Sequence, residues 1–199
     1  MPIDTKQLNE LLYQALETEI GGQAVYAKAI ECAENEEVRE EWQKYLRETE
    51  GHERILREAF SRIGLDPEIE TPGREVVRSK GEALVAAMDS ALDGAGPRAA
   101  QLVAAESIVE AETKDHQNWE LIGLAMKSLK GETQKALMEA HEQVEDQEDE
   151  HLYHTMGWAR ELWLESLGLP AVLPPPEEKK EVKTAIGAAR ARQQRDEML

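Results

Sequence analysis

The sequence EDQEDEH at residues 145–151 lies in the middle of a long segment with helical periodicity. Its Glu148 and His151 are three residues apart, so on a helix both side chains reach the same side and can bind one metal ion. At about 100° per residue, Val144 and Trp158 fall on the same face, which is the apolar face of the segment. A chance Glu-x-x-His is common in a Glu-rich chain. An ionised carboxylate on a core face, however, is costly unless it is paired or bound to a cation.

Length and composition favour an all-α protein. The chain has 199 residues, enough for one domain with a substantial core and an appendage. Its 41% hydrophobic and 32% charged residues, with only one Phe, are typical of long helices with solvated outer faces. The net charge of −18 repels nucleic acid and anionic membrane surfaces, so we expect neither as a partner and expect cations as ligands.

The single cysteine, Cys32, excludes an intrachain disulfide framework and a Cys-x-x-Cys metal site, and is interpreted as a small packing residue. The sequence shows no signal-peptide pattern and no run of about 18 apolar residues. The expectation is a soluble, cytoplasmic protein.

Helical periodicity, interrupted by Gly and Pro, predicts four long helices and a helical crossover between the second and third. Asn35 can cap the second helix, and Pro97 suits the first turn of the third. We expect long helices at residues 5–33, 36–64, 97–129 and 132–168, a crossover helix at 75–94, a bundle domain at 1–169 and a tail at 170–199.

The tail begins with a stiff, Pro-rich linker that contains Pro170 and the run Pro174 to Pro176. Beyond it, residues 177–199 have mixed charge and a weak helical pattern. Two interpretations remain open. The segment is either a solvated, partly ordered tail or a helix that docks on another subunit or a partner protein.

Each long helix places acids or histidines on its apolar face near mid-length. One such acid could be an accident, but acids and histidines at matching depth on four core faces predict a bound cation. Glu17 lies about 160° from its helix's stripe, so it is expected in solvent. The inward candidates are Glu19; His52 with Glu48 nearby; Glu112 with His116; and Glu148 with His151.

The two halves of the chain resemble each other. Glu19 is followed seven residues later by Tyr26, and Glu112 seven residues later by Trp119. Each of these helices then leads to a helix with an inward histidine.

With these motifs, residues 5–168 resemble the ferritin-like superfamily of four-helix di-iron carboxylate proteins, which take one Glu from each of two helices and Glu-x-x-His from the other two. The order of Glu19, Tyr26 and the run Glu48-Thr49-Glu50-Gly51-His52 is similar to rubrerythrin, bacterioferritin and bacterial stress-related ferritin-like proteins. The resemblance implies a ferritin-like four-helix bundle with a partly helical crossover. It also implies the ligands Glu19, His52, Glu112, Glu148 and His151.

One position departs from the family pattern. Thr49 stands where the second bridging Glu is expected, so Glu48 or Glu53 is a candidate substitute and His116 a candidate extra ligand. The absence of Cys-x-x-Cys excludes the rubredoxin module of full rubrerythrin.

The resemblance implies two irons per chain, with manganese as the other candidate metal, and oxidation of iron(II) by O₂ or peroxide. Glu112 and Glu148 are the expected bridging ligands, while Tyr26, Thr49 and Trp119 pack beside the site. Two alternatives stay open: a metal-binding stress protein without turnover, and a structural bundle whose tail recruits a partner. Trp163 and Leu164 lie off the core stripe and predict a homodimer or higher homo-oligomer.

Overall fold

The computed structural model of the chain describes residues 3–199. These residues form helices and no strand, which confirms the predicted all-α class. Within this range, no helix combines the length and apolarity needed to cross a lipid bilayer. The elements are α1 (Thr5–Cys32), α2 (Glu36–Ile63), α3 (Pro72–Gly94), α4 (Pro97–Met126), α5 (Gly131–Ser166), α6 (Pro176–Lys179), α7 (Ala185–Gln193) and the 3₁₀ segment η1 (Arg195–Met198).

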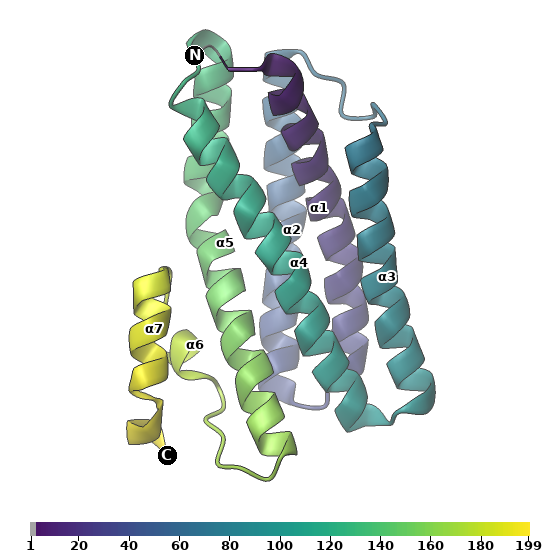
Figure 1. The fold of residues 1–199 in the computed structure, drawn as a ribbon, viewed down its shortest axis with the longest axis vertical. Coiled ribbons are helices and arrows are strands. Elements are labelled where there is room, and N and C mark those ends of the chain that lie inside the picture. The colour runs from purple at the N-terminus through teal and green to yellow at the C-terminus, as the bar shows by residue number, and fades with distance from the viewer. Residues whose placement is uncertain (1–2) are drawn as a thin grey trace.

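Four long helices pack side by side and enclose the core (Figure 1). Helices α1 and α5 each contact both α2 and α4, so every long helix has two long neighbours. Neighbouring long helices are antiparallel, because α1 and α5 run in one direction and α2 and α4 in the other (Figure 1). Helix α3, which follows α2 and precedes α4 in the chain, runs along the outside of the bundle and packs against α1 and α4 (Figure 1).

Local signals set the helix ends. Asp4 and Asn35 accept hydrogen bonds from backbone amides in the first turns of α1 and α2, and Gly64 ends α2 with a φ of 76°. The crossover helix begins at Pro72, three residues before the predicted start. It starts there because the Thr71 hydroxyl accepts a hydrogen bond from a first-turn amide and Pro72 suits that turn.

The core consists of two apolar clusters that are separated along the long helices. One cluster contains Tyr45 and Trp158, and the other contains Leu16 and Phe60. Between the two, all four long helices carry buried polar side chains. These are Glu19 of α1, Thr49 and His52 of α2, Glu112 and Asp115 of α4, and Glu148 and His151 of α5.

Helix α3 covers a face of α1 that the sequence analysis assigned to solvent. Glu17 is therefore buried, at 3% exposure, and its expected solvation is wrong. Its carboxylate lies 2.8 Å from the guanidinium of Arg74 and 2.7 Å from that of Arg78, both on α3. Because periodicity around α1 alone cannot show a fifth neighbour, this contact was missed.

The C-terminal segment folds back onto its own chain (Figure 1). Helix α6 contacts α5, where the buried Glu177 forms a bidentate ion pair with Arg160 at 2.8 Å. Arg195 pairs with Glu161 of α5 at 2.7 Å. The segment is thus not a freely solvated tail, and its docking site within the described chain is α5.

Removing the carboxylate of Glu17 should destabilise the protein strongly. Glu17→Ala leaves the buried guanidinium of Arg74 without its partner, which costs about 3–5 kcal/mol. Glu70→Ala is the matched control, because Glu70 pairs with Arg78 at an exposed site worth about 0–1 kcal/mol. Chemical denaturation of both variants measures the difference. Equal losses of unfolding free energy would show that α3 is not held through Glu17.

Candidate metal centre

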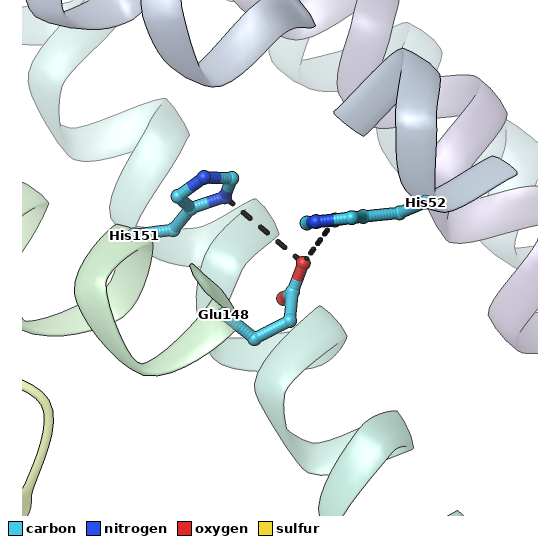
Figure 2. A group of neighbouring side chains, drawn as sticks. All are labelled: His52, Glu148 and His151. Carbon is cyan, nitrogen blue, oxygen red and sulfur yellow. Dashed lines mark ion pairs between the residues drawn. The ribbon is translucent and has the colours of Figure 1, made fainter. Parts of the chain in front are cut away.

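Six buried ionisable side chains meet between the two apolar clusters. His52, Glu148 and His151 offer ligand atoms that all lie within 4.8 Å of one another, and so do Glu19, Asp115 and Glu148. Glu148 therefore belongs to both groups. Figure 2 shows its carboxylate between the imidazole rings of His52 and His151. The sixth side chain, Glu112, lies on the His151 side.

His52 is held by one ring nitrogen and presents the other to the acids. Its Nε2 lies 2.8 Å from the side-chain oxygen of Gln147, to which it donates a hydrogen bond. The opposite nitrogen, Nδ1, lies 2.7 Å from Glu148 Oε1 and 3.7 Å from Glu19 Oε2. In this tautomer Nδ1 carries a lone pair that faces carboxylate oxygens, an arrangement that a cation stabilises.

His151 is arranged in the same way. Its Nε2 donates a hydrogen bond of 2.9 Å to Glu48 Oε2. Its Nδ1 faces Glu112 Oε2 at 3.6 Å and Glu148 Oε1 at 4.0 Å. Both histidines therefore point Nδ1 into one space that is lined by carboxylates.

Helices α2 and α5 each supply the residue that orients the histidine of the other helix. Glu48 lies four residues before His52 on α2 but holds His151 of α5, whereas Gln147 lies four residues before His151 but holds His52. Such partners fix the ring orientation and tautomer of metal-binding histidines. Glu48, predicted as a candidate ligand, is placed as an orienting partner. Gln147 was missed, although its spacing from His151 equals that of Glu48 from His52.

Helices α1 and α4 likewise each supply a side chain that holds a carboxylate of the other helix. The Tyr26 hydroxyl of α1 donates a hydrogen bond of 2.6 Å to Glu112 Oε1, and the Trp119 indole of α4 donates one of 2.8 Å to Glu19 Oε1. Each carboxylate keeps its second oxygen free for the shared space. Tyr26 and Trp119, which were expected beside the site, thus hold Glu112 and Glu19 in place, and the seven-residue spacing in both helices has a structural reason.

Asp115 is the acid that the sequence analysis missed. Thr49 is buried on α2, and its Cγ2 lies 3.4 Å from where a Cβ on Gly22 would stand. Thr49 therefore supplies a methyl contact with α1 and no carboxylate. Asp115, only 5% exposed, enters the group instead from α4, three residues after Glu112.

The spacing along α4 explains this difference. Its buried face follows Ile108, Glu112, Asp115, Trp119 and Ile122, which alternate by four and three residues. The sequence analysis placed His116, four residues after Glu112, on the inward face. That expectation is wrong, because Asp115 occupies the inward position and the His116 side chain is 26% exposed.

Two other candidate ligands lie outside the group. The His116 side chain is 26% exposed, and its Nδ1 lies 3.2 Å from Asp149 Oδ1. Glu53 pairs with Arg57 at 2.7 Å and accepts a hydrogen bond from Gln23. Both residues have partners at the surface, so neither is brought to the centre.

Buried polar atoms without a hydrogen-bond partner concentrate at this centre. Among the described residues, nine such side-chain atoms occur, and seven belong to the six side chains of the group. Unpartnered buried polar atoms are rare and costly in folded proteins. Their convergence fits a bound cation. The seven atoms are Glu19 Oε2, His52 Nδ1, Glu112 Oε2, Asp115 Oδ1, both oxygens of Glu148, and His151 Nδ1.

The pKa values reflect the same crowding of charge. Burial, together with the negative charge of Glu112, raises the pKa of Glu148 to about 8. Burial and neighbouring acids also raise the pKa values of Glu19 and Asp115 well above their usual range. Burial alone would lower the pKa of His151, but the adjacent carboxylates outweigh it and raise that pKa to about 10. Protons or metal ions must therefore balance the acids.

Comparisons with protein-family models, curated proteins and solved structures find no match to this chain. The side chains of the centre therefore carry the functional inference.

The metal-free protein should become less stable as pH rises from about 5 to about 8. Glu148 and His151 have raised pKa values, so the folded chain holds more protons than the unfolded chain in this range, and loses that advantage as they dissociate. Burial lowers the pKa of His52, which acts in the opposite sense but is a single group.

We expect the melting temperature after chelation to fall by roughly 5–10 °C across this range, measured by circular dichroism. Glu148→Gln is the control, because it removes a titrating carboxyl and should flatten the curve. A melting temperature that rises with pH in the wild type would contradict the assignment of raised pKa values.

Proposed function

We propose that this protein is a ferritin-like carboxylate protein that binds two iron ions and oxidises iron(II) with O₂ or peroxide. One observation carries the proposal. Seven buried, unpartnered ligand atoms converge from six side chains on the four long helices α1, α2, α4 and α5. They are four carboxylates and two imidazoles, a donor set that suits iron(II) or manganese(II).

The donor set has the composition that the ferritin-like pattern requires, with one acid relocated. That pattern takes four carboxylates and two histidines from four helices. Here α2 provides His52 without a carboxylate, while α4 provides both Glu112 and Asp115. The relocated acid supports the proposal that Asp115 replaces the glutamate expected at Thr49.

The distances support two ion positions that share Glu148. Glu19 and Asp115 group with Glu148 on the His52 side. Glu112 lies on the His151 side. Glu148, with both oxygens unpartnered, lies between these sets, which supports the proposal that it would be the ligand shared by two ions. In this proposal Glu112 would be a terminal ligand, whereas the sequence analysis expected it to bridge together with Glu148.

When bound, two iron(II) ions would supply two electrons, one each, which together with two protons would reduce one hydrogen peroxide molecule to two waters. The chain holds the acceptor oxygens of Glu19 and Glu112 through Trp119 and Tyr26, and excludes bulk water with two apolar clusters. Glu48 is 20% exposed and hydrogen-bonded to His151, so it connects the buried centre with solvent and can pass protons.

A purely structural role for the cluster explains the centre less well. In a structural network of buried polar side chains, the polar atoms form hydrogen bonds with one another. Here His52 Nδ1 and Glu148 Oε1 lie 2.7 Å apart without the geometry of a hydrogen bond, and both remain unpartnered. A structural network also predicts no change of melting temperature on chelation.

Anaerobic reconstitution with iron(II) should yield two irons per chain, measured by elemental analysis. Glu148→Ala should lose most of this iron, because the variant lacks the side chain shared by both ion positions. Glu145→Ala is the matched control, since it removes a 60% exposed carboxylate three residues away on the same helix. Equal iron content in the two variants would refute the centre.

Addition of peroxide or O₂ to the loaded protein then tests turnover. We expect oxidation to iron(III), followed by absorbance, in the wild type and Glu145→Ala but not in Glu148→Ala. If two irons bind but stay reduced, the protein binds metal without turnover, and the oxidase function is excluded.

Asp115 and His116 give a sharper test of the ligand set. Asp115→Asn keeps the side-chain shape but removes a charge, and should lower the iron content from two toward one per chain. His116→Ala changes the adjacent residue, which pairs with Asp149 outside the centre, and should retain both irons. The reverse result would restore the ligand set that helical periodicity predicted.

A further inference from the structure

A cavity of about 530 Å³ lies between α1, α3 and α4, beside the metal centre. This volume is within the range of small-molecule sites. Its wall is mostly apolar, with Val25 of α1, Val77 and Leu84 of α3, and Val109 of α4. The charged side chains at its edge are Glu17, Lys80, Glu110 and Lys114.

Small residues keep this space open. Gly21 of α1 and Gly81 of α3 both line the cavity, and a Cβ on Gly81 would lie 3.7 Å from the Gly21 Cα. A Cβ on Gly21 would meet no atom within 4 Å, so its packing does not require glycine. Glycine within a helix costs about 1 kcal/mol relative to alanine. Glycine at position 21 therefore leaves cavity volume that a larger side chain would fill.

The charges at the edge favour a single negative charge on the occupant. Among residues 3–199, Lys80 forms no ion pair, and Lys114 donates a hydrogen bond to the neutral amide of Asn118 rather than to an acid. Neither lysine is therefore neutralised, although the chain has a net charge of −18. The carboxylate of Glu17 is already neutralised by two arginines of α3. Glu110 remains as an exposed acid, so the two lysines leave the edge with a net charge near +1.

We propose that this cavity binds an amphipathic monoanion, an alkyl carboxylate of medium chain length. The alkyl chain packs against the valines and Leu84, and the carboxylate lies at Lys80 and Lys114. A doubly charged phosphate head group fits the net charge less well. The binding does not depend on the metal proposal, because none of the six ligand side chains lines the cavity.

The cavity and the centre are nevertheless adjacent. Thr18 and Lys114 line the cavity and directly precede Glu19 and Asp115 in the sequence. Asn118 of α4 donates a hydrogen bond of 3.0 Å to the Thr18 hydroxyl, which ties the two helices together at this wall. An occupant of the cavity therefore contacts the backbone segments that carry two of the proposed ligands.

Calorimetric titration of the full chain with decanoate tests the proposal. Octanoate, which is two methylenes shorter, should bind about 15-fold more weakly, because each buried methylene contributes about fourfold in affinity. Decyltrimethylammonium, with the same chain and the opposite charge, should bind more weakly than decanoate. The affinity for decanoate should be the same before and after chelation, whereas its loss on chelation would show that the carboxylate binds the metal instead.

Variants locate the site. Gly21→Leu fills the cavity from a helical position with free space and should weaken decanoate binding at least tenfold without lowering the melting temperature. Lys80→Gln should weaken binding about two- to fivefold, as expected for one exposed ion pair. Lys135→Gln, the same change on α5 away from the cavity, should have no effect. No binding to the wild type, or equal binding to Gly21→Leu, would overturn the proposal.

Discussion

The balance of buried charge is the constraint on which the whole molecule depends. Two apolar clusters fill the space between four long helices, and the layer between them contains four carboxylates and two imidazoles. Apolar burial stabilises the clusters, but the ionised layer opposes folding unless protons or cations neutralise it. The helices therefore need a counter-charge at mid-length. This requirement links the stability of the protein to the chemistry of its centre.

The layer is built by reciprocal contacts between the two halves of the chain. Tyr26 and Trp119 cross between α1 and α4 in opposite directions, and Glu48 and Gln147 do the same between α2 and α5. Neither half can orient its own acids or histidine. The geometry of the centre exists only when both halves are docked, which explains why aromatic and polar residues recur at equal spacing in both.

Much of this arrangement was predictable from the sequence because helical periodicity reports which face of a helix is buried. The periodicity identified the inward positions of Glu19, His52 and Glu148, and composition identified the helical class. Periodicity did not identify which other helices pack against each helix. Glu17 is buried by a fifth helix, and Asp115 rather than His116 faces inward because α4 follows a 3–4 spacing. The choice between positions about 100° apart depends on packing that one helix does not encode.

The two orienting partners of the histidines differ in charge. His151 donates its hydrogen bond to the carboxylate of Glu48, whereas His52 donates to the neutral amide of Gln147. A carboxylate partner makes an imidazole a stronger electron donor than an amide partner does. Two ions held by this chain would therefore be inequivalent. The asymmetry is built into the chain itself, because the stronger donor lies on α5 and the weaker one on α2.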